Sequence, residues 1–183
     1  LGGEFNQIKK SWQDAADDTY RLLRFAFCFP DTYQLGMSNL ALKILYDLVN
    51  QEETLLCERV FAPWVDMKKI MEEQNIPLFS LENHMPVANF DCIGFSLSYE
   101  LAFSPTLALL KLAGIPLRSL DRQEEDPIII AGGPVTYNIE PMADFLDIVL
   151  MGEGEESLIE LLSLMRTMRV IGGASRKEFL LEV

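Results

Sequence analysis

The chain alternates short, uninterrupted apolar runs with segments in which apolar residues recur every three or four positions. Uninterrupted runs are typical of strands buried on both faces of a parallel sheet, and the longer spacing is typical of helices that cover such a sheet. A proline, a glycine or a polar loop follows each run and ends it. Five such runs predict the main strands, over residues 22–29, 54–61, 92–98, 127–131 and 147–151.

Helices are predicted after the first, second, third and fifth of these strands. Ser38 is placed to cap the first helix, and Ser175 with Glu178 forms a capping-box pattern that opens a short final helix. The first helix runs to residue 50, and the other predicted helices cover residues 63–74, a segment that ends at residue 113, and residues 155–169.

The periodicity also predicts which helical residues face the core. In the first helix they are Leu40, Ala41, Ile44, Leu45, Leu48 and Val49, and in the second Trp64, Met67, Ile70 and Met71. Residues 76–81 read as a short extended piece, which would form a small extra strand at most.

Strands that alternate with helices predict right-handed βαβ units, and hence an α/β fold with a mainly parallel sheet. Five strands favour the flavodoxin-like order 2-1-3-4-5, in which the sheet lies between two helical layers of a three-layer sandwich. One α/β domain is expected over residues 21–172. Residues 1–20 are interpreted as a polar lead-in, and residues 173–183 as the start of a linker or helix towards a further domain. Because the chain does not begin with Met and ends in mid-pattern, we expect it to be a piece of a larger protein.

The charge, the length of the apolar runs and the cysteine spacing limit the binding partners and the cellular compartment that we expect for this chain. The 28 Asp and Glu residues against 15 Lys and Arg give a formal net charge of −13, which disfavours direct contact with nucleic acid. No apolar run reaches the roughly 18–20 residues of a membrane span, and no signal peptide opens the chain, so no membrane partner is expected. Cys28, Cys57 and Cys92 lie far apart in predicted strands. Buried, inert thiols in a reducing cytoplasm are therefore expected, rather than disulfides or a zinc site.

Candidate functional residues gather where the predicted strands end. Glycine at such an end lets the backbone approach a ligand, and open α/β sheets bind their ligands at that edge. The candidate binding residues are Asp31, Tyr33, Gly36, Ser96, Ser98, Tyr99, Gly132, Gly133, Pro134, Gly152, Glu153 and Gly154.

Each of these loops also has a purely structural interpretation. The glycines would serve equally as tight strand exits, and the serines would serve to satisfy local backbone groups. The edge carries no nucleophile–base pair, and His84, the single histidine, lies in a separate polar loop. This arrangement favours binding over catalysis, with no catalytic residue and no metal ligand assigned.

Several segments together resemble a known family. The chain is similar over nearly its whole length to the N-terminal, cobalamin-binding-like domain of an uncharacterised bacterial group of radical S-adenosylmethionine (SAM) proteins. The segments that carry the resemblance are residues 1–6, 29–38, 58–64, 77–82, 93–100, 112–118, 131–134, 140–141 and 152–155. The resemblance implies a non-catalytic, cofactor-binding-like module whose partner is the radical domain of the same parent chain.

The chain departs from that family pattern in two ways. It has no Cys-x3-Cys-x2-Cys motif, so the resemblance places the four-iron, four-sulfur cluster and S-adenosylmethionine in an absent downstream domain. Domains that bind cobalamin through histidine carry Asp-x-His-x-x-Gly in the first-strand loop, where this chain has Tyr33 between Asp31 and Gly36. A phenol is a poor axial ligand at neutral pH, since its pKa is near ~10. We therefore expect cobalamin to bind weakly or not at all, and never with histidine on cobalt.

Two further interpretations stay open beside the cofactor module. The domain would then be a cofactor-free structural or interaction domain that shapes access to the radical domain, or a free-standing flavin binder. The flavin alternative is the weakest, because the first-strand loop lacks a Ser/Thr-rich phosphate cradle.

Overall fold

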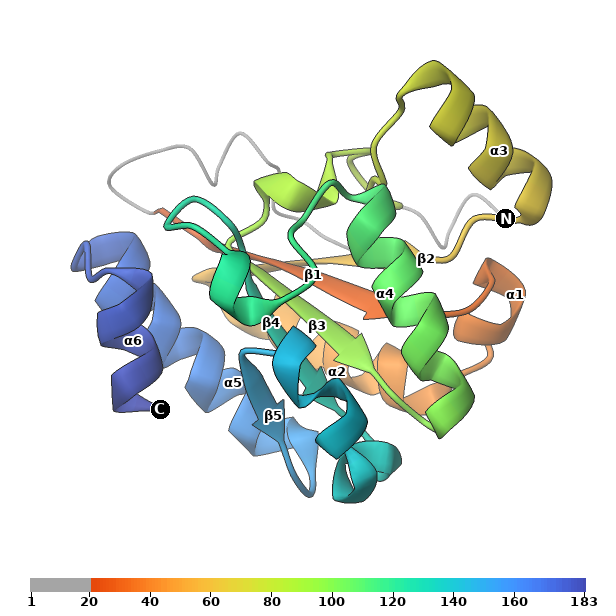
Figure 1. Cartoon of the computed structure of the whole chain (residues 1–183). Coiled ribbons are helices and arrows are strands. Elements are labelled where there is room, and N and C mark those ends of the chain that lie inside the picture. Colours follow the sequence, from red (N-terminus) through yellow and green to blue (C-terminus); the bar gives the residue numbers. More distant parts are fainter. Residues whose placement is uncertain (1–20) are drawn as a thin grey trace.

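The computed structural model describes residues 21–183, and its centre is a five-stranded sheet (Figure 1). The strands are β1 (Leu23–Phe29), β2 (Leu55–Phe61), β3 (Cys92–Ser96), β4 (Ile128–Gly132) and β5 (Ile148–Leu150). All neighbouring pairs are parallel, and the order is β2-β1-β3-β4-β5. The α/β class, the parallel sheet and the flavodoxin-like order are thus confirmed.

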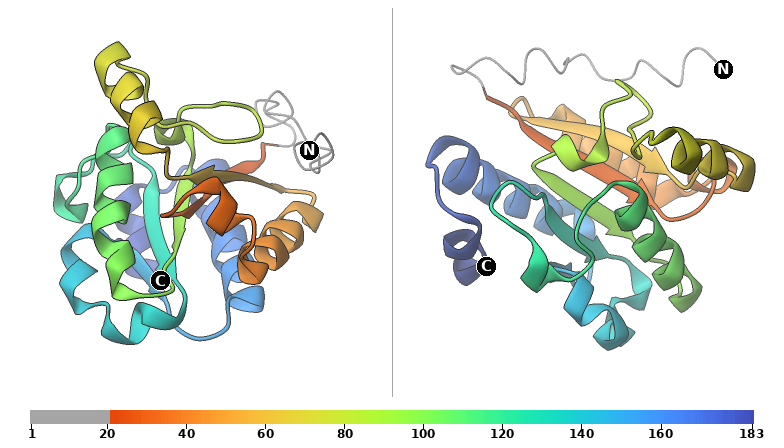
Figure 2. Two further views of the ribbon diagram at one scale, coloured as in Figure 1. Left: turned by 90° about the vertical axis from the view of Figure 1, so that its right-hand side faces the viewer. Right: turned by 45° about the horizontal axis from the view of Figure 1, so that its top comes forward.

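Helices cover both faces of the sheet (Figure 2). The α-helices are α1 (Tyr33–Gly36), α2 (Leu40–Gln51), α3 (Val65–Gln74), α4 (Phe103–Leu112), α5 (Gly154–Met165) and α6 (Arg176–Glu182). Short 3-10 turns are η2 (Val87–Asn89), η3 (Glu100–Ala102), η4 (Ser119–Asp121), η5 (Pro134–Asn138) and η6 (Glu140–Phe145), and a π-helical turn, η7 (Arg166–Ile171), extends α5. No helix within residues 21–183 is long and apolar enough to cross a membrane.

Alternation along the strands divides the core into two layers. Phe25 and Phe27 of β1 pack with α2, α5 and α6, whereas Ala26 and Cys28 pack with α4 and the turns that precede β5. β3 lies in the middle of the sheet, as its unbroken apolar sequence predicts. The three cysteines are all buried in strands, and burial raises the pKa of each thiol. A raised pKa keeps a thiol protonated and unreactive at neutral pH.

The predicted inward face of α2 is right for Val49, which is buried, and for Leu45, which packs against the core, but wrong for Leu40, Ala41 and Ile44. Leu40 is 69% exposed and Ile44 also faces solvent, while Leu42, Tyr46 and Val49 are buried. The helix is apolar on more than one side, so spacing alone leaves its rotation undecided. Its cap is also one residue later than predicted: the side chain of Asn39, not Ser38, accepts a hydrogen bond from the Leu42 amide at 2.9 Å.

The predicted inward face of α3 is also largely wrong. Of its four predicted core residues only Met71 is buried, and Trp64, Met67 and Ile70 are exposed. Figure 1 shows α3 projecting from the body of the domain. The segment that follows α3 covers the sheet in its place, through buried Leu78, Val87 and Phe90. That segment is not an extra strand, since it forms a single antiparallel bridge between Phe79 and Pro86.

The same segment closes the outer edge of β2. Glu82 accepts hydrogen bonds from the backbone N of Arg59 at 2.8 Å and from its Nε at 2.7 Å. The guanidinium of Arg59 also lies 4.4 Å from the ring centre of Tyr46 on α2. An edge strand with free N–H groups invites pairing with another chain. A buried carboxylate therefore occupies part of the edge that a further strand would need.

The capping box that the sequence predicts is present at α6. Ser175 Oγ accepts from the Glu178 amide at 3.2 Å, and the Ser175 amide donates to Glu178 Oε2 at 2.8 Å. α6 packs against the domain through the fully buried Phe179. The lead-in predicted for residues 1–20 lies outside the described residues.

Candidate functional site

The carboxyl ends of the strands meet at one edge of the sheet, where a slot of about 280 Å³ opens between α2 and α5. We call this cavity the slot. Its floor is the sheet face that carries Phe25, Phe27, Gly94 and Ile130, and its sides are Leu45 of α2 and Leu158 of α5. The remaining lining residues are Asn39, Ala41, Phe95, Ser96, Ser98, Ala131, Gly132, Gly133, Pro134, Leu150, Gly152, Gly154 and Glu155.

Glycines keep the slot open. A Cβ on Gly132 would meet nothing closer than 3.8 Å, one on Gly154 would lie 3.5 Å from Leu45, and one on Gly152 would have no neighbour within 4 Å. At Gly94 the missing side chain makes room for the ring of Phe25, which a Cβ would approach to 2.5 Å. Empty space therefore lies in front of Gly132, Gly152 and Gly154, whereas the space at Gly94 is already filled.

Gly133 has a structural role in shaping this edge. Its φ is +112°, and a Cβ there would lie 2.4 Å from the carbonyl oxygen of Leu97. The Leu97 amide donates to the Gly132 carbonyl at 2.8 Å, which ties the β3 exit to the β4 exit. Only glycine fits between these two backbones. Replacing Gly133 would thus disturb the fold before it filled the slot.

A second contact joins the β1 and β3 exits. Tyr99 donates its hydroxyl hydrogen bond to Asp31 Oδ2 at 3.2 Å, and Asp31 Oδ1 accepts from the Thr32 amide at 2.6 Å. Desolvation and the hydrogen bond to Asp31 raise the pKa of Tyr99. Ser96 and Ser98 line the slot and also line the small hollow that contains Asp31 and Tyr99. The pair stands between β1 and β3, where the strand order reverses and where such sheets bind ligands.

Tyr33 and Gly36 lie away from the slot. The Tyr33 ring packs edge-on against Phe61 at the end of β2, with ring centres 5.5 Å apart. Gly36 is wedged against the same ring, which a Cβ would approach to 2.2 Å. The short α1 turns both residues towards β2, so they pack the β1 loop onto its neighbour.

The predicted edge residues therefore divide into groups. Seven line the slot, Asp31 and Tyr99 form the adjoining pair, and Glu153 stands at the start of α5 beside the slot without lining it. Sequence reasoning did not assign the other lining residues, among them Phe25, Phe27, Asn39, Leu45 and Glu155. The alternation of Phe25, Phe27 and Ile130 could have placed them on one sheet face, but not the gap between α2 and α5 above them.

Comparisons with known proteins give the family of the chain. A family profile described as "Radical SAM proteins, N-terminal" matches residues 41–183. The chain belongs to this family. An uncharacterized protein of Methanocaldococcus jannaschii is 27% identical over 152 residues, which make up 82% of this chain and 28% of that protein. The chain thus spans little more than a quarter of this relative's length. No solved structure matches the chain.

The side chains of this radical SAM N-terminal domain can be tested against the cofactors that such a family implies. No histidine, cysteine or lysine lines the slot, so nothing there can supply an imidazole to cobalt. His84 has a φ of +54° and its ring lies 5.9 Å from that of Phe79, in the loop beside β2. Within residues 21–183 no three His, Cys, Asp or Glu side chains are grouped so as to hold a metal ion. The slot fits a flat apolar group but not a histidine-ligated cobalt or an iron–sulfur cluster.

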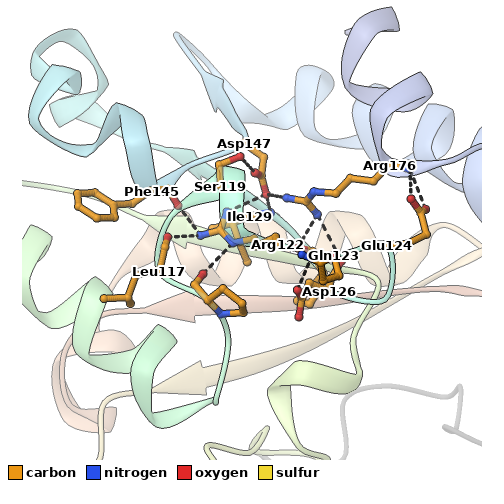
Figure 3. Close-up of polar contacts among 12 residues, drawn as sticks. Leu117, Ser119, Arg122, Gln123, Glu124, Asp126, Ile129, Phe145, Asp147 and Arg176 are labelled. Atoms are coloured by element: carbon orange, nitrogen blue, oxygen red, sulfur yellow. Dashed lines mark hydrogen bonds and ion pairs between the residues drawn. The ribbon is translucent and has the colours of Figure 1, made fainter.

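The opposite edge of the domain holds a buried ionic network centred on Asp147 (Figure 3). Asp147 Oδ2 lies 3.0 Å from Nη1 of Arg122 and 2.5 Å from Nη2 of Arg176, and it accepts from the Ile129 amide at 2.7 Å. Ser119 donates to the other oxygen. Both side chains of the Asp147–Arg122 pair are fully inaccessible to solvent.

The two arginines of this network are also held by the backbone. Arg122 donates to the carbonyls of Pro116, Leu117 and Phe145, at 3.0, 2.7 and 2.7 Å. Desolvation lowers the pKa of Arg122, and the charge of Asp147 opposes that effect. The backbone N of Arg176 donates to both oxygens of Glu124, which fastens the start of α6 to the loop before β4. A network so fully engaged holds α6 in place, and it offers little to a ligand.

Proposed function

We propose that this chain is the non-catalytic N-terminal cofactor-binding module of a radical SAM protein, and that the slot is its binding site. The observation that carries the proposal is the slot itself. It is an apolar cavity at the carboxyl edge of a parallel sheet, with glycines that leave it open and a few polar residues in its lining. Ligand sites in proteins combine these features.

The cofactor that we propose for the slot is cobalamin, bound without a protein ligand on cobalt. The apolar lining of the slot, which includes the partly exposed Leu45 and Leu150, offers a surface for the flat dimethylbenzimidazole group of cobalamin. When bound, cobalamin would supply the chemistry of its cobalt to the radical domain. The residues of this chain would hold the flat group, keep water from it and orient the rest of the cofactor through Ser96 and Ser98.

Titration with hydroxocobalamin, followed by its visible spectrum, tests this proposal. We expect weak binding, in the micromolar range or above, that Ala41→Leu reduces at least tenfold because the larger side chain narrows the slot. Ala143→Leu makes the same change on η6, outside the slot, and should leave binding unchanged. His84→Ala should change neither affinity nor spectrum. Absence of binding, or binding insensitive to Ala41→Leu, would contradict the cofactor role.

A second candidate function rests on a different observation. Large apolar side chains are exposed around the same edge, in the loops that follow β1, β3, β4 and β5. They are Leu35, Leu40, Tyr99, Leu101, Tyr137 and Met151. Apolar side chains gathered at one end of a domain mark a surface that another protein surface covers. We infer that the radical domain of the parent protein covers this edge, since the matched region makes up only 28% of the relative.

Matched exposed leucines at opposite edges test the second candidate. Leu101 follows β3 and is 82% exposed, and Leu120 precedes β4 and is 93% exposed. We expect Leu101→Glu to weaken the association of this domain with the separately purified radical domain by at least tenfold in a binding assay. Leu120→Glu should have no effect. Equal effects of the two variants would exclude the carboxyl edge as the interface.

A further inference from the structure

A second apolar cavity, of about 290 Å³, lies beside α3, and we call it the α3 groove. It shares no lining residue with the slot, and none of the described residues that line it is charged. Its walls come from α3, from the loop after β1 and from the segment that follows α3, and they include Tyr33, Phe61, Trp64, Met67 and Met71. An exposed apolar surface of this kind marks a site that another part of a protein covers.

The side of α3 that faces this groove carries three regularly spaced apolar residues. They are Trp64, Met67 and Met71, which follow one another at intervals of three and four and so lie along one side of the helix. Met71 is buried, whereas Trp64 is 60% exposed and Met67 is 42% exposed. An apolar groove along a helix accommodates a second amphipathic helix whose contact residues have a similar spacing.

The first part of the chain contains a segment with the same spacing. Residues 1–20 precede the described part, and their sequence places Phe5, Ile8 and Trp12 at intervals of three and four. This spacing predicts a short helix with one apolar side. Glu4 at its beginning and Lys10 near its end have the charges that the helix dipole favours. Such a helix requires an apolar surface to cover its apolar side.

Residues 13–20 are long enough to connect Trp12 to the α3 groove. β1 and β2 pair in register with Leu23 opposite Leu55, and Phe61 at the groove lies six residues beyond Leu55. The groove is therefore about 20 Å along the sheet from the level at which β1 begins. Eight extended residues span up to about 26 Å. The groove is thus within reach of the segment that contains Trp12.

We propose that residues 5–12 bind the α3 groove as a helix, with their three apolar side chains against the groove side of α3. A segment tethered to its own site has an effective concentration of about a millimolar, so it has the advantage over a separate protein of the same chemistry. The contact also covers Tyr33, which lines the groove and packs against Phe61. The segment thereby holds the loop after β1, whose Asp31 pairs with Tyr99 next to the slot.

The two tryptophans of the chain lie on opposite sides of the proposed contact, Trp12 in the segment and Trp64 in the groove. Fluorine NMR of the 183-residue chain labelled with fluorotryptophan resolves one signal for each, and Trp12→Phe assigns them. The change in shift between light and heavy water measures how far each ring is exposed. For Trp12 we expect less than half the change seen for free fluorotryptophan, with no dependence on protein concentration.

Charged substitutions on the two sides of the contact provide the matched comparison. Met67→Glu places a carboxylate in the groove and should make Trp12 as exposed as free fluorotryptophan. Val65→Glu adds the same charge in the same turn of α3, at a residue that is 81% exposed and does not line the groove, and should leave Trp12 covered. Ile8→Glu changes the segment instead of the groove and should expose Trp12 as Met67→Glu does.

Three results would overturn the proposal. Full exposure of Trp12 in the unaltered chain would leave the groove to another domain. Coverage of Trp12 that disappears on dilution would mean that a second copy of the chain supplies the segment. Coverage that survives both Met67→Glu and Ile8→Glu would place Trp12 on a different surface. If the amide spectrum shows that Met67→Glu disturbs the fold, Ile8→Glu decides the result, because it alters no residue of the described domain.

Discussion

The two edges of the sheet differ in chemistry: the amino edge holds a buried ionic network, and the carboxyl edge holds an open apolar cavity. At the amino edge the buried carboxylate of Asp147 has four partners, which are two buried arginines, the partly buried Ser119 and a backbone amide. At the carboxyl edge the backbone turns on glycines, leaves the slot open and exposes apolar side chains around it. A buried carboxylate with every partner satisfied contributes a rigid, specific arrangement, whereas an open apolar edge contributes room for another molecule.

Removal of Asp147 should produce the largest effect on stability. Asp147→Ala leaves Arg122 and Arg176 buried without their carboxylate, and breaking a buried pair in this way costs about 3–5 kcal/mol. A typical domain has about 5–15 kcal/mol in total, so α6 and the β4–β5 region should loosen together. Urea unfolding checks the value. Asp144→Ala, three residues away on the exposed side of η6, is the matched control and should stay within about 0.5 kcal/mol of wild type.

A loss below about 1 kcal/mol for Asp147→Ala would contradict the role assigned to the amino edge. Water would then stabilise the charges of Arg122 and Arg176 as well as Asp147 does. Asp147→Asn sharpens the result, since it keeps an acceptor for the Ile129 amide and removes the charge. We expect it to fall between wild type and Asp147→Ala.

Substitutions at the adjacent Gly132 and Gly133, at the carboxyl edge, should lower the free energy of unfolding by less than Asp147→Ala does. Gly133→Ala places a Cβ 2.4 Å from the Leu97 oxygen at a φ of +112°, and strained backbone of this kind costs about 1–3 kcal/mol. Gly132→Ala meets nothing closer than 3.8 Å and should be nearly neutral. Thermal unfolding of the two single variants gives the comparison. If both are equally destabilising, the carboxyl edge is as tightly packed as the amino edge.

The fold was predictable because its signals are local. Uninterrupted apolar runs such as Ile128–Ala131 read as buried parallel strands, and the glycines after them mark the edge where a cavity lies. The direction in which a helix faces is not local. Leu40 fits an apolar spacing, yet it is exposed because α2 packs through a different face, and Trp64 is exposed because the segment after α3 covers the sheet instead.

The buried network escaped the sequence prediction for a similar reason. Arg122 stands in a charged stretch that reads as a solvated turn, and only the tertiary structure shows that Asp147 and three carbonyls surround it. The sequence does contain one indication of such a contact, because Asp91 and Asp147 each stand directly before an apolar strand. In both cases the carboxylate accepts a backbone amide of the neighbouring strand, from Arg24 and Ile129 respectively.

The smallest expected effect concerns the cap that begins α6, beside the Asp147 network. Glu178 accepts hydrogen bonds from the Ser175 amide and hydroxyl, both at 2.8 Å, and these bonds lower the pKa of Glu178 below its ordinary value. A lowered carboxyl pKa means that the stabilisation is present above the ordinary pKa and is lost as pH falls through the folded pKa. The cap should therefore be intact at neutral pH and fail only in acid.

A carboxyl-detected NMR titration of Glu178 tests this expectation. Wild type should titrate below the ordinary glutamate value, and Ser175→Ala should move the Glu178 pKa upward because the hydroxyl donor is gone. Ser175→Ala should also cost about 1 kcal/mol at neutral pH, the usual value of a helix cap. This is a fraction of the cost of Asp147→Ala, since Arg176 still holds the start of α6 to Asp147 and Glu124. An equal loss from the two variants would mean that the cap, and not the buried carboxylate, fastens α6 to the domain.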